Sequence, residues 1–358
     1  MTDKNSMPPL HNGRPWVSFC MSTYRRAGFL RKTLALIRMQ TFTDFEVVIS
    51  DNDPEESAAS VVGELQDPRF RYYPNKANLG MVASFNKSIE RSRGEFIVMI
   101  TDDDPVYPEM LQVLHDLTIQ YPGYGMYIGG HDTFFGGLLQ ARMAKAHVGM
   151  NSSLSDWELG AVKTFSPGEF PLAFLDGRFS GGLLWSVAIV KREIALSIGG
   201  FPDYGTPHLA DCSYLLLSGS RAGCVHINTS LGNRAIHDDN YSYSSANYES
   251  IYKAPEGFIR WTEERMPSGS ITPEIRQAIT HYIGRDMTVY AISIKKMHQT
   301  LGVKSPEFEQ FRRRFFRLAP MRKWRRKYFI SVNYPNLFEL FLDFRKVLFP
   351  PKIKIPGK

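Results

Sequence analysis

The regular alternation of short apolar runs with amphipathic stretches in the first 120 residues most constrains the fold of this chain. The apolar runs have the length of strands and lie at residues 16–21, 45–50, 70–73 and 96–100. The stretches with helical spacing lie at residues 28–40, 57–65, 81–91 and 108–120. Such alternation predicts an α/β fold with a mostly parallel sheet flanked by helices. The run at 96–100 contains no polar residue, so we expect it to be buried on both faces.

Acidic residues follow the most apolar of these predicted strands. Ligands of parallel sheets bind at the carboxyl ends of the strands, and this rule selects the loops at 22–28, 51–56 and 101–107. The last loop contains Asp102, Asp103 and Asp104 in succession. Adjacent carboxylates repel one another, and a divalent cation such as Mg²⁺ or Mn²⁺ would offset the repulsion together with the phosphates of a substrate. The alternative is a solvated turn, but the position after a buried strand favours function.

Several short motifs around this acidic run resemble a known family. They are Leu79-Gly80, Phe85-Asn86-Lys87, Arg93-Gly94-Glu95-Phe96-Ile97 and the aspartates themselves, with Met21-Ser22-Thr23-Tyr24-Arg25 and the segment from Gln40 to Asp51-Asn52 upstream. Together they resemble the donor half of the family 2 glycosyltransferases of bacterial cell-surface polysaccharide synthesis, which have the GT-A fold. The resemblance extends over residues 16–236 and is most specific in the first 110 residues.

The resemblance implies a nucleoside-diphosphate sugar as donor and a divalent metal, Mn²⁺ or Mg²⁺, as cofactor. The residues implied in donor binding are Ser22, Tyr24, Asp51, Asn52, Asn86, Asp102 and Asp103. The residues implied in metal binding are Asp103, Asp104 and His237, and the motif does not decide between the two aspartates. Two positions of this donor half differ from the family pattern. Asn52 replaces an aspartate, which leaves bases other than uracil open because an amide both donates and accepts. Phe85 replaces an arginine.

A second group of residues resembles the acceptor half of the family. Inverting transfer needs one general base that takes the proton of the acceptor hydroxyl. Asp211, in the segment His208-Leu209-Ala210-Asp211-Cys212, matches the position of the catalytic aspartate of the family, although the preceding glutamate is Ala210 here. A carboxylate at the start of a helix also acts as a cap, so that both roles remain open. Asp203, in a Pro-Asp-Tyr-Gly turn, is the second candidate.

The charge of the chain is concentrated in its C-terminal region. Residues 311–358 contain 14 Lys/Arg and 2 Asp/Glu, so with a whole-chain charge of +7 residues 1–310 carry −5. Aromatic and aliphatic residues recur at helical spacing among these cations, as Phe308, Phe311, Phe315 and Leu318 and again in 337–348. Basic amphipathic helices of this kind are typical of an anionic membrane surface, and a packed helix pair is the alternative. We expect no nucleic-acid partner, because the rest of the chain is net negative.

These observations predict three regions: a flexible N-terminus at 1–13, a GT-A-like catalytic domain at 14–240 and a helical, basic C-terminal extension at 241–358. Within the catalytic domain, 14–110 would bind the nucleotide-sugar and 111–240 the acceptor. Neither a signal peptide nor a membrane-spanning segment is expected. The three cysteines are too scattered for a disulfide framework, which favours the cytoplasm.

The predicted function is therefore metal-dependent, inverting transfer of a sugar to a hydroxyl of a saccharide or lipid-linked saccharide. The enzyme would work as a peripheral protein on the inner face of the cell membrane. The alternatives are a nucleotidyltransferase, which would also use a nucleotide site with acidic metal ligands, and a non-catalytic protein that binds nucleotide-sugar or nucleic acid. A P-loop nucleotidase is disfavoured because no glycine-rich lysine loop is present.

Overall fold

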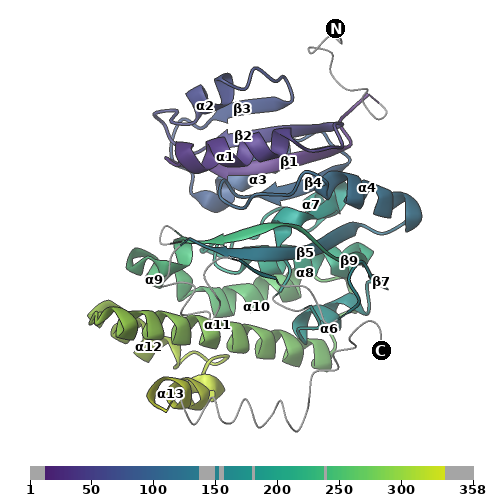
Figure 1. The fold of residues 1–358 in the computed structure, drawn as a ribbon. Coiled ribbons are helices and arrows are strands. Elements are labelled where there is room, and N and C mark those ends of the chain that lie inside the picture. Colours follow the sequence, from purple (N-terminus) through teal and green to yellow (C-terminus); the bar gives the residue numbers. More distant parts are fainter. Residues whose placement is uncertain (1–12, 137–149, 153–156, 180–181, 238–239, 335–358) are drawn as a thin grey trace, which may run out of the picture.

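The computed structural model describes residues 13–136, 150–152, 157–179, 182–237 and 240–334. A nine-stranded sheet forms its centre, with strand order β3-β2-β1-β4-β8-β5-β9-β7 and β6 paired to β5 (Figure 1). The strands are β1 (Val17–Thr23), β2 (Phe45–Asp51), β3 (Phe70–Pro74), β4 (Phe96–Ile100), β5 (Met126–Phe135), β6 (Met150–Ser152), β7 (Val162–Phe165), β8 (Ala188–Lys191) and β9 (Cys224–Ile236).

Helices cover the sheet and form a separate layer below it in Figure 1. The helices that precede β9 are α1 (Ala27–Arg38), α2 (Ala59–Gly63), α3 (Met81–Arg91), α4 (Met110–Gln120), α6 (Phe170–Leu175), α7 (Arg192–Ser197) and α8 (Ala210–Ala222). The C-terminal layer contains α9 (Tyr248–Ile251), α10 (Ala254–Arg265), α11 (Pro273–Leu301), α12 (Pro306–Phe315) and α13 (Arg325–Asn333). Short 3₁₀ turns are η1 (Trp185–Val187), η2 (Tyr241–Tyr243), η3 (Ser245–Asn247) and η4 (Arg322–Trp324).

The sheet confirms the predicted fold class. β3, β2, β1 and β4 run parallel, and β5 and β9 are parallel to each other. β8 lies antiparallel between β4 and β5 and joins the two parallel sets. All five residues of β4 are buried, as its apolar sequence predicts. The carboxyl ends of β1, β2 and β4 therefore meet at one edge, with the acidic loop directly after β4.

β9 is longer than its sequence pattern indicates. The pattern predicts a strand over residues 222–227, whereas the structure extends it to Ile236. Its pairing with β5 shifts in register at Gly129 and Gly130, and a side chain at Gly129 would come within 2.4 Å of Leu231. The far half of β9 lacks clear alternation because it borders a cavity instead of the core. This extension brings Arg234 and His237 to the edge that carries the acidic loop.

The C-terminal helices share one hydrophobic core with the sheet. The cluster of buried residues runs from Trp16 to Val332, and α11 packs against α6, α10 and α13. The helical nature of the predicted extension is confirmed for its described part. The boundary at residue 240 stays a prediction, because the core is continuous across it.

The structure corrects the orientation predicted for the aromatic residues around α12. Phe308, Phe311 and Phe315 are 0–3% exposed and pack in the core, with Phe311 stacked on Tyr248. The apolar face of this segment is therefore a protein-packing face, since the free energy of burial is gained against other helices. The second predicted segment, 337–348, lies outside the described residues. No helix among the described residues is long and apolar enough to span a bilayer.

Candidate active site

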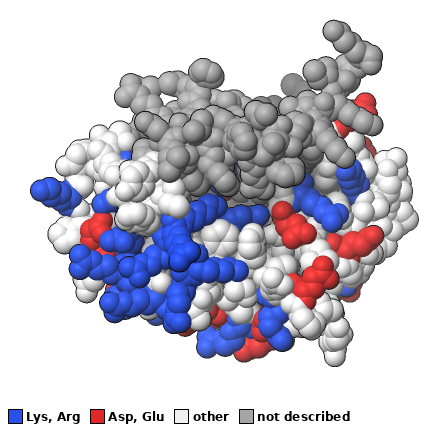
Figure 2. Space-filling view, turned by 90° about the horizontal axis from the view of Figure 1, so that it is seen from below, with Lys and Arg blue, Asp and Glu red and all other residues white. Residues whose placement is uncertain are grey.

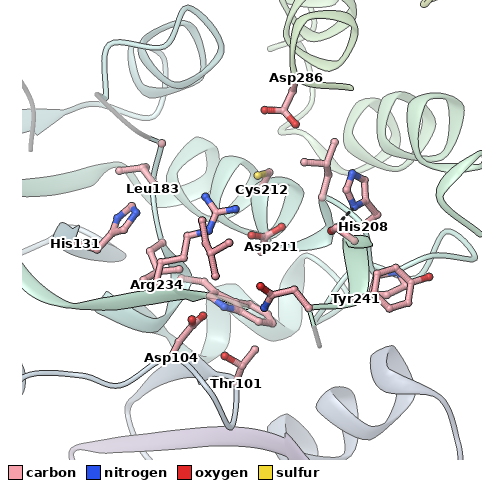
Figure 3. Close-up of a pocket in the computed structure, with 18 of the residues that line it drawn as sticks. Thr101, Asp104, His131, Leu183, His208, Asp211, Cys212, Arg234, Tyr241 and Asp286 are labelled. Atoms are coloured by element: carbon pink, nitrogen blue, oxygen red, sulfur yellow. Dashed lines mark hydrogen bonds between the residues drawn. The ribbon is translucent and has the colours of Figure 1, made fainter. Parts of the chain in front are cut away.

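A cavity of about 600 Å³ opens at the carboxyl edge of the sheet (Figure 3). Its walls come from the loop after β4, the far half of β9, the start of α8 and the middle of α11. The polar residues among its lining are Arg26, Thr101, Asp103, Asp104, His131, His208, Asp211, Arg234, Asn240, Ser242, Arg285 and Asp286. A cavity of this size accommodates a small-molecule ligand.

Arg26 joins three of the predicted site residues. Its Nη1 donates to Asp102 Oδ1 at 2.7 Å and its Nη2 donates to Asp103 Oδ2 at 2.6 Å. His237 Nε2 lies 3.0 Å from the same Asp103 oxygen and 3.4 Å from Arg26 Nη2. The ring of Phe29 stacks on His237 and also lies under the guanidinium of Arg26. The acidic loop is thus held together by a cation that comes from the start of α1.

The first and last aspartates of the loop are the more deeply buried. Asp102 accepts from Thr23 Oγ1 at 2.8 Å, and Asp104 accepts from the backbone N–H of Ala235 at 3.0 Å. Burial raises the pKa of each carboxyl group to about 7, and the negative charge of Asp103 adds to both shifts. A cation bound next to these carboxyl groups would lower their pKa and so favour the ionised form.

Asp103 and His237 have the chemistry of a pair of metal ligands. Oδ2 of Asp103 and Nε2 of His237 lie 3.0 Å apart, and Nη2 of Arg26 contacts both atoms. Divalent cations such as Mg²⁺ are commonly held by one or two protein ligands together with substrate phosphates and water. No group of three or more His, Cys, Asp or Glu side chains converges within the described part of the chain. Asp103 and His237 therefore fit a cation whose remaining ligands come from the phosphates of a bound molecule.

The residues predicted to contact the nucleoside form a separate polar cluster at the ends of β1 and β2. Ser22 Oγ donates to Ser84 Oγ at 2.8 Å, and the side chain of Asn52 binds the backbone N–H of Leu79 at 2.8 Å. Asp51 is fully buried and accepts from the N–H groups of residues 53 and 58 and from a tyrosine hydroxyl. Tyr24 is 40% exposed beside this cluster. Asp51 and Asn52 thus shape the loops, and their role in donor binding stays a prediction.

Asn86 lies away from the acidic loop. Its amide donates to the carbonyl oxygen of Phe201 at 3.0 Å and accepts from the N–H of Phe201 at 2.7 Å. A side chain at Gly200 would lie 2.4 Å from Asn86 Oδ1, so only glycine allows this approach. Asn86 therefore fixes the Gly-Gly-Phe turn that precedes α8, which positions Asp211.

Asp211 lies in the first turn of α8 and faces the cavity (Figure 3). Burial raises the pKa of its carboxyl group above the usual value, which brings a potential base closer to neutral pH. Asp203, the second candidate, is exposed and accepts from the N–H of Gly205 at 3.2 Å in its own turn. It does not line the cavity, so the geometry favours Asp211.

Four further residues that sequence reasoning did not select as functional also line the cavity. Arg234 and Arg285 are cations, Asp286 is a carboxylate on α11, and His208 has a buried Nε2 without a hydrogen-bond partner in the described structure. Burial lowers the pKa of His208 to about 4, so the ring is neutral at pH 7. Asp286 is 75 positions from Asp211 in the chain, and only the packing of α11 joins them.

Comparison with known proteins agrees with the fold and the motifs. Residues 18–179 match the model of glycosyl transferase family 2. An uncharacterized glycosyltransferase of Methanocaldococcus jannaschii is 33% identical over 103 residues, which cover 28% of this chain and 36% of that protein. The GalNAc(5)-diNAcBac-PP-undecaprenol beta-1,3-glucosyltransferase of Campylobacter jejuni is 31% identical over 103 residues, 28% of this chain and 33% of that protein. Such matches span between a third and two fifths of these relatives.

Solved structures share the fold over most of the chain. The crystal structure of Staphylococcus aureus TarS superposes with a TM-score of 0.52 at 12% identity, covering 86% of this chain and 55% of that one. TarS 1-349 in complex with UDP-GlcNAc gives a TM-score of 0.50 at 12% identity, covering 87% and 92%. Likeness at this identity shows the fold alone. Residues 18–179 thus match glycosyl transferase family 2, and the chain shares the GT-A fold with these solved structures.

Proposed function

We propose that the protein is an inverting glycosyltransferase that moves a sugar from a nucleoside-diphosphate sugar to an acceptor hydroxyl. The observation that carries the proposal is one cavity with Asp103, hydrogen-bonded to His237, on one wall and the carboxylate of Asp211 on another. A diphosphate on the first wall and a hydroxyl on the second would place the sugar carbon between them.

The roles of the side chains follow from their positions. Asp211 accepts the proton of the acceptor hydroxyl while the oxygen attacks the anomeric carbon, and the bond to the diphosphate breaks on the opposite face of the sugar. Asp103 and His237 would hold a Mn²⁺ or Mg²⁺ ion, which would supply positive charge to offset that of the departing diphosphate. Arg26 and Arg234, which also line the cavity, offer hydrogen-bond donors to the same anion.

Donor binding can be tested by thermal stabilisation with UDP, CDP, GDP and dTDP, each with and without Mn²⁺. A ligand of the folded state raises the melting temperature by mass action. We expect a metal-dependent shift with one nucleotide, its loss in Asp103→Asn and His237→Gln, and its retention in the control Asp203→Asn. No shift with any nucleotide would contradict the proposal. Release of a nucleoside diphosphate with the acceptor identifies transfer, whereas release of pyrophosphate would identify a nucleotidyltransferase.

We further propose that the acceptor is linked to lipid and that the enzyme docks on an anionic membrane, in the assembly of a bacterial surface polysaccharide. Figure 2 shows Lys and Arg side chains gathered on the face that carries α12 and α13 in Figure 1. Residues 311–334 contain nine Lys/Arg and no Asp/Glu. The relative from Campylobacter jejuni is named for an undecaprenol-linked substrate, and one from Escherichia coli for colanic acid biosynthesis.

The side chains that meet the membrane differ from those favoured by the sequence pattern. The buried aromatic residues of α12 are unavailable for lipid, but Phe329 and Ile330 of α13 and the following Tyr334 are 54%, 39% and 53% exposed. The cations Arg322, Lys323, Arg325 and Arg326 are exposed beside them. Basic residues near the surface of an anionic bilayer contribute about 1 kcal/mol each, and exposed aromatic residues insert at its interface.

Sedimentation with vesicles tests the docking face. Deleting 311–358 would remove core residues, so the variant replaces Arg322, Lys323, Arg325 and Arg326 by Gln. We expect the wild type to pellet with phosphatidylglycerol-containing vesicles, and not with pure phosphatidylcholine, and the variant to remain in the supernatant. A control variant replaces Arg31, Lys32 and Arg38 of α1. Binding that persists in the first variant, or a preference for RNA over vesicles, would contradict the proposal.

A further inference from the structure

The cavity continues past Asp211 to a wall formed by the long C-terminal helix α11. Tyr282, Arg285 and Asp286 of this helix line the cavity, and their spacing of three and four residues places them on one helical face. Figure 3 shows Asp286 on the opposite side of Asp211 from the acidic loop that follows β4. This wall belongs to residues beyond the family match at 18–179.

Two arginines line the cavity near its carboxylates without pairing directly with them in the described part of the chain. Neither Arg234 nor Arg285 forms a hydrogen bond or an ion pair within the described residues, although both line the cavity. The positive charge of Arg234 lowers the pKa of Asp104, Asp211 and Asp286. These three carboxyl groups lie on both the proposed donor side and the proposed acceptor side of the cavity. The charge of Arg285 acts on Asp286. A guanidinium group that is held in a confined site without a partner favours binding of an anion, because planar anions accept two of its N–H bonds.

Arg285 is held in place by the surfaces around it. A side chain at Gly177, which follows α6, would lie 3.0 Å from Nη1 of Arg285, so that the guanidinium group rests against the backbone there. The same group lies 5.4 Å from the ring centroid of Tyr282. These contacts orient the donor face of Arg285 without using its hydrogen bonds, which is an arrangement suited to ligand recognition.

Asp286 and the aromatic lining complete a surface for a sugar. Carboxylate oxygens accept hydrogen bonds from sugar hydroxyls, and Asp286 faces the cavity partly exposed. Burial raises the pKa of its carboxyl group, with the charge of Asp211 adding to the shift. The rings available to a sugar are Phe174, Phe179, Trp185, Tyr241, Tyr243 and Tyr282. One wall therefore offers a cation, a hydroxyl acceptor and apolar faces together.

We propose that this wall is an acceptor subsite specific for a saccharide with an anionic group, a carboxylate or a phosphate, which Arg285 binds while Asp286 accepts from its hydroxyls. The inference rests on the proposed function, since it names the chemistry of the acceptor that Asp211 would deprotonate. The two anions share the same recognition by a guanidinium group, and separate probes distinguish them.

Saturation-transfer NMR with glucose, glucuronic acid and glucose 1-phosphate tests the subsite. We expect one or both anionic probes to bind more tightly than glucose, and Arg285→Gln to weaken that binding about tenfold or more without affecting glucose. Arg285→Lys should recover only part of it because the fork geometry is lost. Arg276→Gln, on the same helix and outside the cavity lining, is the control. Preference for glucuronic acid identifies a carboxylate, and preference for glucose 1-phosphate a phosphate.

The subsite and the proposed function can fail separately. Equal binding of glucose and both anions, or anion binding unchanged in Arg285→Gln, would overturn the subsite even if metal-dependent nucleotide binding is retained. Asp286→Asn should weaken all three sugars while leaving the nucleotide shift intact. Anion binding that depends on Arg285 in a protein without nucleotide binding would retain the subsite and reject the glycosyltransferase proposal.

Discussion

The two walls of the cavity differ in how their charges are paired. On the donor side, Arg26 binds Asp102 and Asp103 directly, and His237 joins the same cluster. On the proposed acceptor side, Arg285 has no hydrogen-bond or ion-pair partner within the described residues. The side chains of the proposed donor wall are thus already held by one another, whereas the proposed acceptor wall keeps N–H donors that a ligand can use. A donor site can be preorganised for a diphosphate, while the specificity for the acceptor depends on groups that remain available.

The largest effect is expected from replacing Asp211 by Asn. Turnover should fall about a thousandfold, because the hydroxyl proton has no acceptor, and donor binding should be unchanged. The raised pKa of Asp211 sets the sign of the pH dependence: the base is lost as pH falls through that pKa, so activity decreases on the acid side. Steady-state kinetics from pH 5 to 8 measures both. An active variant would assign the base to another group.

Replacing Arg26 by Met should destabilise the protein without ligand by about 2–3 kcal/mol, because two buried carboxylates lose their cation. The neighbouring Arg25 is the matched control: it is half-exposed and pairs with Asp53 and Glu55, so Arg25→Met should cost much less than Arg26→Met. Urea unfolding with and without Mn²⁺ gives the comparison. Mn²⁺ should recover more stability in the Arg26 variant than in the control. Equal losses in both would show that the donor wall does not depend on this cation.

Asn86→Ala should reduce stability by about 2 kcal/mol, since both backbone groups of Phe201 lose a partner. Asn86→Asp keeps the acceptor and loses the donor, so an intermediate loss is expected. Thermal denaturation and nucleotide titration of the two variants separate the structural role from donor binding. Weakened nucleotide binding at unchanged stability would favour the donor-binding role that the family resemblance implies.

The smallest effect concerns His226, which is buried among Trp157 and Phe179. Burial lowers the pKa of its ring to about 4, below the value of about 6.5 in an unfolded chain. The unfolded state therefore binds the proton first, and stability falls as pH drops from about 6.5 towards 4. Between pH 7 and 5.5 this contribution is about 1 kcal/mol. Urea unfolding of His226→Gln should show a smaller loss over this range, and an identical loss would exclude His226 as its source.

The strands and the acidic loop could be predicted because their signals are local. An apolar run such as that of β4 favours burial on both faces, and three adjacent aspartates after it favour a site with a compensating cation. Asp211 and His237 were predicted from short motifs, and the structure places both beside the cavity. Asn86 was named for donor binding, yet its amide is occupied by Phe201, a contact 115 positions away in the chain.

The sequence by itself determines the succession of strands and helices along the chain, the carboxyl edge on which the acidic residues lie and the basic character of the C-terminal region. Each of these follows from residue types that are neighbours in the chain. The direction in which Phe308, Phe311 and Phe315 point was decided only by tertiary structure, because a helical stripe looks the same whether protein or lipid covers it. The tertiary structure alone also placed Arg26 between two carboxylates and brought α11 to the cavity. Ion pairs and cavity walls form between segments that are distant in the sequence, so a local pattern of residues does not indicate which side chains will meet.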